Sequence, residues 1–342
     1  MKAVRIHCHG GPEVLRLEDI REPQFRPDQI LLRVRACALN RLDLWVRQGI
    51  PGMEFPMPHV LGSDIAGEVM AVGEECHTVQ PGWRVLLAPG LSCRRCPQCF
   101  AGRDNLCSRY AVFGYGIGGG NAELLAAPEY AAIRIPDAMS FEQAAAVPLV
   151  FLTAWHMLLG RAQLAPGEDV LVLAASSGVG SAAIQIAKLF HCRVIATAGG
   201  ERKLEQARAL GADFAIDHYR QDIAAEVKRI TARRGVDVVV EHTGAATWPA
   251  SLASLARNGR LVTCGNTTGY DVRIDLRFLF TRQQSLLGSY MGTLGELHEV
   301  SRFVFGGQLK PVIDRVYPLG EVASAHERLE KREQFGKVIV QV

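Results

Sequence analysis

The sequence has little net charge and no long apolar run. Basic residues exceed acidic ones by three over 342 residues, and no basic run is laced with aromatic side chains. Nucleic acid and acidic membrane surfaces are therefore poor candidates for its main partner. Nowhere do about eighteen apolar residues follow one another, so no membrane-spanning helix is expected. Residues 1–15 lack the apolar core and cleavage site of a signal peptide, which predicts a cytoplasmic protein.

The chain is longer than one hydrophobic core usually supports, so two domains are expected. Apolar residues make up 48% and charged residues 21%, as in ordinary soluble globular proteins. Nine cysteines without a secretion signal fit a reducing compartment, in which thiols are kept for metals.

Four of these cysteines form a compact motif, Cys93-x2-Cys96-x2-Cys99-x7-Cys107. Four thiolates at this spacing can converge on one tetrahedral ion, which is typical of structural zinc. The intervening residues are mostly polar, as expected of an exposed lobe over about 90–110. The alternatives are disulfides, free thiols or an iron–sulfur cluster. The bacterial ferredoxin pattern, however, places its fourth cysteine after three residues and follows it with proline, whereas Ser108 follows here.

Residues 1–148 are expected to be mostly β, because short apolar runs alternate with turn clusters such as Gly10-Gly11-Pro12 and Pro81-Gly82. After Pro148 the pattern changes. Solid apolar strands recur with helical stretches between most of them, at 170–174, 193–198, 213–216, 236–240, 260–264 and 286–290. Such an alternation predicts a doubly wound parallel sheet of the Rossmann type, so the fold class is α/β. The terminal run 337–342 is predicted to be a strand that could rejoin the first domain.

A glycine-rich turn follows the first of these strands. Gly178-Val179-Gly180, with Ser177 before it and Ala183 after it, satisfies G-x-G-x-x-G/A between a strand and a helix. Glycines allow backbone N–H groups to approach a pyrophosphate at the positive end of the helix. We therefore predict a dinucleotide site here; the alternative is a glycine-rich turn without a ligand.

The end of the second strand has no carboxylate. An NAD site usually places an acidic residue there for the ribose hydroxyls, but this chain has Ala198-Gly199-Gly200, then Glu201, Arg202 and Lys203. Arg202 or Lys203 could balance a 2′-phosphate, which favours NADP(H) over NAD(H). Alternatively, Arg202 and Lys203 are only solvent-exposed residues at the start of a helix, and Glu201 reaches the ribose. His218, near the end of the next strand, is a further candidate on the adenosine side.

Together these features resemble the medium-chain dehydrogenase/reductase superfamily over essentially the whole chain. Besides the cysteine lobe and 175–180, the resemblance rests on Gly11-Pro12-Glu13-Val14-Leu15, on Leu61-Gly62-Ser63-Asp64-Ile65-Ala66-Gly67 and on Pro148-Leu149-Val150-Phe151-Leu152-Thr153-Ala154-Trp155. It implies a GroES-like catalytic domain of residues 1–148 and 292–342, a Rossmann domain of residues 149–291, and an active site in the cleft between them.

Zinc-dependent alcohol dehydrogenases of this family also hold a catalytic zinc. The resemblance places its three ligand positions at Asn40, Ser63 and Leu149. An amide, a hydroxyl and an isobutyl group do not make a zinc site. The pattern is instead similar to the zinc-free quinone oxidoreductase branch. Cys37 and His59 lie outside the ligand positions; a rebuilt site from Cys37, His59 and Asp64 is the alternative.

The resemblance therefore implies hydride transfer from a nicotinamide to a quinone or another conjugated carbonyl compound. Asn40 and Ser63 would donate to the substrate oxygen, and Asp64 would be an acid or a structural carboxylate. It also implies that Thr153 and Gly288-Ser289 lie near the nicotinamide, Asn266 along the cofactor and Lys337 at the pyrophosphate, with Asp43 as the buried partner of Lys337. The loop 114–121 either forms part of the substrate wall or is an ordinary surface loop.

Two other functions stay open from the sequence alone. One is a zinc alcohol dehydrogenase with a displaced metal site, and the other is a nucleotide-binding module in which reduction is vestigial. The resemblance further implies a homodimer or homotetramer, with contact through the predicted edge strand near 286–290.

Overall fold

The computed structural model describes every residue from Met1 to Val342, and the chain divides into two compact units. The first comprises Met1–Leu149 and Thr293–Val342, and the second comprises Val150–Gly292. No helix is both long and apolar enough to cross a lipid bilayer.

The first unit is built on a seven-stranded sheet with the order β10-β6-β5-β3-β18-β17, and β9 pairs separately with β3. Its strands are β3 (Gln29–Ala38), β5 (Asp64–Val72), β6 (Arg84–Leu87), β9 (Leu124–Pro128), β10 (Ala132–Arg134), β17 (Ile313–Pro318) and β18 (Lys337–Gln341). The terminal strand β18 lies antiparallel to β3, which confirms the prediction that the end of the chain rejoins the first domain.

Smaller elements complete this unit. A three-stranded sheet has the order β2-β1-β4 and a two-stranded sheet joins β7 to β8. These strands are β1 (Lys2–Ile6), β2 (Arg16–Asp19), β4 (His59–Val60), β7 (Gly90–Leu91) and β8 (Ala111–Val112). The helices are α1 (Arg41–Gln48), α2 (Pro97–Phe100), α3 (Phe141–Ala145), α10 (Leu294–Phe305) and α11 (Val322–Glu330).

The core of the first unit follows from strand alternation. Ile30, Leu32 and Val34 occupy alternate positions of β3, and each is at most 1% exposed. They pack with Ile65 and Val69 of the neighbouring β5. The first unit is therefore mostly β, as the sequence predicts.

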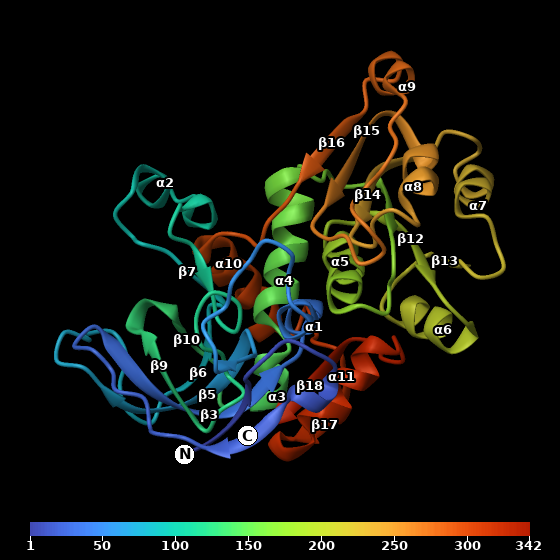
Figure 1. Cartoon of the computed structure of the whole chain (residues 1–342). Helices are drawn as coiled ribbons and strands as arrows, with labels where there is room; N and C mark the ends of the chain where they lie inside the picture. The colour runs from blue at the N-terminus through green and yellow to red at the C-terminus, as the bar shows by residue number, and fades with distance from the viewer. The chain divides into compact units, whose positions relative to one another are not determined.

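The second unit holds a six-stranded parallel sheet with the order β13-β12-β11-β14-β15-β16, which is the doubly wound order and confirms the predicted Rossmann architecture (Figure 1). Its strands are β11 (Asp169–Val172), β12 (Arg193–Ala198), β13 (Phe214–Asp217), β14 (Val236–Glu241), β15 (Leu255–Thr263) and β16 (Ser285–Gly288). The helices are α4 (Pro148–Trp155), which spans the boundary between the units, a π-helical turn His156–Arg161, α5 (Gly178–Leu189), α6 (Glu201–Ala209), α7 (Ile223–Ile230), α8 (Trp248–Ser254) and α9 (Leu276–Thr281).

One strand starts earlier than predicted. The sequence pattern places its first residue at 260, after Asn258-Gly259, a pair that is typical of a turn. Asn258 does adopt a left-handed conformation, with φ of 60°, but β15 continues through it from Leu255. Its first residue pairs with Val236 before the register shifts at a bulge.

One face of the parallel sheet is covered by α7 and α8. Val227 of α7 and Trp248 of α8 pack against Leu171, Ile195 and Val239 of the strands. The strands are buried on both faces, which explains their continuous apolar sequence.

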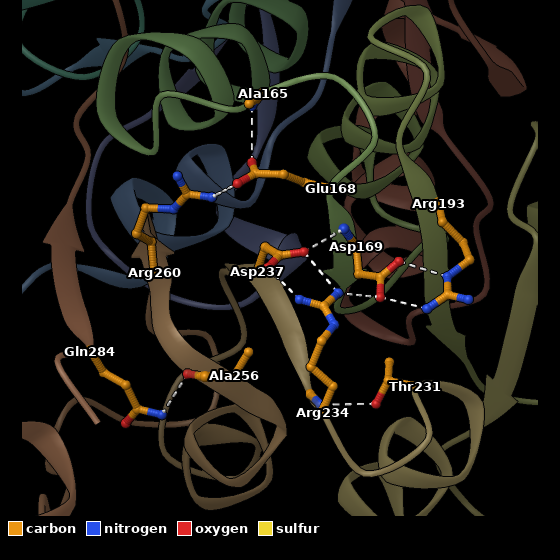
Figure 2. Close-up of polar contacts among 11 residues, drawn as sticks. Ala165, Glu168, Asp169, Arg193, Thr231, Arg234, Asp237, Ala256, Arg260 and Gln284 are labelled. Carbon is orange, nitrogen blue, oxygen red and sulfur yellow. Dashed lines mark hydrogen bonds and ion pairs between the residues drawn. The ribbon is translucent and has the colours of Figure 1, made fainter. Parts of the chain in front are cut away.

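A network of charged side chains ties together the amino ends of the strands (Figure 2). The carboxylate of Asp169 on β11 accepts from Arg193 of β12 at 2.6 Å and also from Arg234. Arg234 donates in turn to Asp237 of β14 at 2.6 Å, and Arg260 of β15 donates to Glu168. This network cross-links four strands at the end of the sheet opposite the glycine-rich turn.

Candidate functional site

The glycine-rich turn lies where the sequence predicts it, between β11 and α5. Ser177 is the N-cap of α5, and its Oγ accepts from the backbone N–H of Gly180 at 2.8 Å. A Cβ atom on Gly180 would lie 2.3 Å from the carbonyl oxygen of Ala174, so only glycine fits. Gly178, Val179 and Gly180 form the first turn of the helix. The N–H of Gly180 is taken up by Ser177, and those of Gly178 and Val179 can bind a phosphate.

The end of β12 forms the predicted small, open turn. The strand ends at Ala198, and Gly200 is the N-cap of α6 with φ of 82°. Arg202 and Lys203 lie in the first turn of α6. The carboxylate of Glu201 is paired with Arg208 at 3.0 Å. Both side chains are exposed, so this ion pair is weak and does not hold Glu201 in a fixed position.

An aromatic pair lies beside this turn, and the sequence predicts only one of its two members, His218. His218 and Tyr219 follow β13, with ring centroids 4.5 Å apart. A Cβ atom on Gly199 would lie 2.3 Å from the ring of Tyr219, so the ring covers the glycine. Tyr219 is 78% exposed. A tyrosine directly after His218, at the carboxyl end of a predicted Rossmann strand, is the sequence signal that points to it.

A cavity of about 400 Å³ opens at the carboxyl ends of β14, β15 and β16. Its lining includes two predicted cofactor residues, Asn266 and Ser289, together with Thr263 and Cys264. The Oγ of Ser289 is buried without a partner, as is the Oγ1 of Thr153 on α4. Burial raises the pKa of Cys264 to about 12, so it remains a neutral thiol.

A buried carboxylate shapes the loop beside this cavity. Glu241 ends β14, and it accepts from the backbone N–H groups of Thr243 and Gly244 and from the hydroxyls of Thr247 and Ser251, at 2.6–3.1 Å. Its oxygens are thus occupied by local donors, which gives it a structural role in the loop 243–247.

In the first unit, three predicted residues meet at adjacent strand ends. Asn40 follows β3 and caps α1, Asp64 begins β5, and Lys337 begins β18. Since β3 lies between β5 and β18 in the sheet, their ends bring these side chains together. All three are at least 93% buried.

These three side chains form a closed hydrogen-bonded cluster. The Nζ of Lys337 donates to Asn40 Oδ1 at 2.6 Å and to Asp64 Oδ2 at 2.7 Å, and Asn40 Nδ2 donates to the same Asp64 oxygen at 2.9 Å. The other oxygen of Asp64 accepts from the backbone N–H of Leu149 at 2.7 Å. Asn40 is therefore held in one orientation, with its carbonyl toward the ammonium group and its amide toward the carboxylate.

The buried Asp43 lies within electrostatic reach of Lys337, as the resemblance implies, but Lys337 donates its hydrogen bonds to Asn40 and Asp64. The Asp43 carboxylate accepts from the backbone N–H groups of Asn40 at 2.7 Å and Gly62 at 2.9 Å, so it braces the start of α1 against the Gly62 turn. Asp64 takes the ion pair because it begins the strand two places from β18. Burial raises the pKa of Asp43 to about 6.

Ser63 lies beside this cluster in the sequence and is fully buried, with no hydrogen-bond partner for its Oγ. The preceding Gly62 has φ of 105°, and a Cβ there would lie 2.5 Å from the Sγ of Cys37. Burial raises the pKa of the Cys37 thiol well above its usual range. His59 Nε2 lies 3.2 Å from the carbonyl oxygen of Gly114. The cysteine lobe holds the one cluster of three or more ligand groups suited to a metal, so Cys37, His59 and Asp64 do not form a second.

The loop 114–121 packs against the same turn. The N–H groups of Gly119, Gly120 and Asn121 donate to the carbonyls of Val60, Gly62 and Leu61, at 2.9–3.0 Å. A Cβ atom on Gly114 would lie 2.5 Å from the backbone of Gly62. This loop is therefore attached along its length to the segment that carries Ser63.

The four cysteines of the lobe converge as the motif predicts. The sulfur atoms of Cys93, Cys96, Cys99 and Cys107 all lie within 4.8 Å of one another. The pairs Cys93–Cys99 and Cys96–Cys99 are 3.9 and 3.5 Å apart, close to the ~3.8 Å between sulfurs around a tetrahedral zinc with bonds of about 2.3 Å. None of the nine cysteines is disulfide-bonded, and four sulfur atoms converging on one point suit a metal ion better than paired disulfides. The four thiolates fit a structural zinc ion.

The lobe contacts the rest of the first unit at two anchors. At its start, the hydroxyl of Tyr130 bonds both backbone groups of Ser92, and the guanidinium of Arg94 lies 4.8 Å from the Tyr130 ring. Before its last cysteine, Asp104 accepts from the backbone N–H of Leu294, the first residue of α10. The cysteine spacing carries no signal for either contact.

Each of the two units contains a segment that matches a known protein family. Residues 26–137 match the family described as "Alcohol dehydrogenase GroES-like domain", and residues 178–306 match "Zinc-binding dehydrogenase". Human quinone oxidoreductase is 30% identical over 336 residues, which span 96% of this chain and 94% of that protein.

The chain belongs to the zinc-binding alcohol dehydrogenase family of the medium-chain dehydrogenase/reductase superfamily. An NAD-dependent alcohol dehydrogenase of Sulfolobus acidocaldarius is 30% identical over the full length of both chains. A crystal structure of an NAD-dependent alcohol dehydrogenase is 47% identical, with a TM-score of 0.97 and complete coverage of both chains. This protein is thus an NAD(P)-dependent oxidoreductase that acts on a small molecule.

Proposed function

We propose that this protein transfers hydride between a nicotinamide coenzyme and an alcohol–carbonyl pair, without a catalytic metal. The observation that carries the proposal is the cluster of Asn40, Asp64 and Lys337. The family resemblance implies that Asn40 and Ser63 stand at the positions of catalytic zinc ligands. The cation next to Asn40 in this chain is the ammonium group of Lys337.

Each residue of the cluster has a distinct role in this proposal. Ser63, whose hydroxyl has no other partner, donates to the substrate oxygen. The second amide hydrogen of Asn40, which makes only a long contact of 3.5 Å with the Ala38 carbonyl, turns to the same oxygen. One such donor contributes about 3 kcal/mol to stabilising a developing alkoxide in a dry site. Lys337 and Asp64 hold Asn40 in the donating orientation. The contacts of Lys337 favour this role over the pyrophosphate contact that the resemblance implies.

A bound nicotinamide supplies or accepts hydride, and the overall reaction is carbonyl plus NAD(P)H plus a proton to alcohol plus NAD(P)⁺. The glycine-rich turn with Ser177 would hold the pyrophosphate, and the cavity lined by Asn266 and Ser289 would hold the nicotinamide side. Thr153, with its unpaired buried hydroxyl, is a further candidate contact.

The comparisons favour an alcohol as substrate over the quinone that the sequence favoured. The similarity to an NAD-dependent alcohol dehydrogenase reaches 47% identity, against about 30% for the quinone oxidoreductases. A quinone or enone remains the second candidate because the chain lacks the ligand set of a Lewis-acid metal, and conjugated acceptors need less activation.

For the coenzyme we propose NADP(H), with NAD(H) as the alternative. The support is the open end of β12, where no carboxylate ends the strand and Arg202 and Lys203 lie in the next helical turn. His218 and Tyr219 would flank the adenosine. Lys203→Ala should weaken NADPH binding about tenfold and leave NADH binding unchanged. An equal loss for both coenzymes would contradict the preference.

We also propose a structural zinc in the cysteine lobe and assembly as a homodimer. The support for the dimer is an apolar surface on the edge of the sheet in the second unit. Leu276, Phe278 and Phe280 of α9 are 66%, 52% and 68% exposed, and the outer side of β16 has no partner strand. Sedimentation analysis of Phe280→Glu against wild type tests it; a wild-type monomer would contradict it.

The function is tested with purified protein, both coenzymes and a panel of primary and secondary alcohols, aldehydes, quinones and enones. Turnover of alcohols and aldehydes that persists in a chelator supports the proposal. Turnover confined to quinones and enones favours the second candidate. Tight coenzyme binding without turnover of any compound would mean a binding module.

A further inference from the structure

A histidine outside all the predicted site residues lies at the point where the parallel sheet changes direction. The chain runs from β11 outward through β12 and β13, then returns to place β14 on the other side of β11. Ligands of such sheets bind at this switch point, beyond the carboxyl ends of the strands. His242 directly follows β14, and Ser177 ends the turn after β11.

These two side chains are hydrogen-bonded across the switch point. The Nε2 of His242 lies 2.9 Å from the Oγ of Ser177, and the same Oγ accepts from Gly180 N–H at 2.8 Å. The other ring nitrogen, Nδ1, is buried and has no partner. The neighbouring carboxylate of Glu241 does not bond it, because that carboxylate is occupied by Thr243, Gly244, Thr247 and Ser251.

The unpartnered Nδ1 decides where the imidazole carries its hydrogen. Burial lowers the pKa of His242, so the ring is neutral near pH 7 and has one N–H. A hydrogen on Nδ1 would be a buried donor without an acceptor, which is the rarer and costlier case. A hydrogen on Nε2 is donated to Ser177 and leaves Nδ1 only as an unpaired acceptor. The second tautomer is therefore favoured.

In that tautomer the hydroxyl of Ser177 has a fixed direction. Its oxygen accepts two hydrogens, one from Gly180 and one from His242, so both lone pairs are used. Its own hydrogen has to point to a third group. The N-terminus of α5, where Ser177 lies, is the place where the free N–H groups favour an anion.

We propose that His242 is a positioning residue, which commits the hydroxyl hydrogen of Ser177 to a phosphate oxygen of the bound dinucleotide. The inference rests on the proposed coenzyme binding at this turn. Without His242 the hydroxyl oxygen keeps a free lone pair, its hydrogen is free to rotate, and part of the phosphate contact is lost.

The test is a set of dissociation constants for NADPH and NADH, measured by titration calorimetry on the full chain. His242→Met removes the donor, Ser177→Ala removes the hydroxyl, and His242→Gln restores an N–H donor at similar reach. We expect H242M and S177A each to weaken the binding of both coenzymes about tenfold. The H242Q protein should regain most of the affinity.

The double variant H242M/S177A should bind no more weakly than S177A, because the histidine acts through the serine. Additive losses, or an H242M protein with wild-type affinity, would overturn the inference. If H242M does not fold, His242→Leu removes the donor with a smaller side chain, and the comparison of H242L/S177A with S177A and with H242L tests the same coupling. A wild-type protein that binds neither coenzyme would instead refute the proposed function itself.

Discussion

Asp104 of the cysteine lobe holds the N-terminus of α10 through Leu294, which lies 190 residues later in the chain. Both carboxylate oxygens accept from the Leu294 N–H, at 3.1 and 3.3 Å. A carboxylate at this place also complements the helix dipole. The N–H of Cys107 donates to the Asp104 carbonyl at 3.0 Å, so the position of Asp104 is coupled to that of a metal ligand.

Removal of the metal is therefore expected to loosen α10. Without the ion, repulsion among the thiolates opens the lobe and withdraws Asp104 from Leu294. Hydrogen–deuterium exchange should become faster over residues 293–297 in chelated protein than in the metal-loaded form. Asp104→Asn should speed exchange at the same residues with the metal still bound. Unchanged exchange there after complete metal loss would contradict the coupling.

His326 on α11 should make the protein sensitive to acid. It lies 3.3 Å from the guanidinium of the fully buried Arg47, and burial, with a smaller effect of Arg47, lowers its pKa to about 3. A lowered pKa contributes stability that is present above about pH 6.5 and is lost as the pH falls toward 3. By pH 4.5 the loss is about 3 kcal/mol. His326→Asn keeps an acceptor for Arg47 but does not titrate.

The free energy of unfolding from urea titrations at pH 7 and 4.5 checks this. The variant should be less stable than wild type at pH 7, and the difference should shrink by about 3 kcal/mol at pH 4.5. Parallel changes in the two proteins would show that His326 does not supply the acid sensitivity.

Asp43 should have the opposite pH dependence. Its pKa is raised from 3.8 to about 6, so its contribution to stability is present below about pH 4 and is lost as the pH rises through 6. Asp43→Asn removes this titration, although it leaves one of the two backbone donors unpaired. In urea titrations between pH 4 and 7 the variant should gain about 3 kcal/mol relative to wild type. A constant difference across this range would contradict the raised pKa.

The charge network of Figure 2 should contribute more to the free energy of unfolding than an exposed ion pair does. Asp169→Asn breaks contacts to two arginines, and the Asp169 side chain is only 6% exposed. Because both arginines are about half exposed, we expect a loss of about 2 kcal/mol in the free energy of unfolding. Glu201→Gln, which breaks an exposed pair with Arg208, is the control and should cost less than about 1 kcal/mol. Equal losses would contradict the structural role.

The sequence predicts the second unit well because its signals are local. Continuous apolar strands and the glycine-rich turn each lie within one short segment, as does the cysteine spacing of the first unit, and each is found in the structure. The main error in the second unit is the start of β15, where Asn258 takes a left-handed conformation without ending the strand.

The contacts of the candidate site could not be predicted in the same way. Lys337 meets Asn40 and Asp64 only because β18 and β5 flank β3, and the order of strands in a mixed sheet is not written in any local pattern. His242 follows an ordinary buried strand, and its importance depends on the reversal of strand order between β11 and β14. The contacts of Lys337 and the position of His242 both depend on the strand order of the sheets.

The count of zinc ions per chain, measured by elemental analysis alongside alcohol oxidation, is the sharpest test of catalysis without a metal. We expect one zinc per chain, which Cys96→Ser and Cys107→Ser reduce toward zero. Two zinc ions per chain in active protein, with the second retained when the lobe cysteines are replaced and activity lost when it is removed, would contradict catalysis by Asn40, Ser63 and their partners.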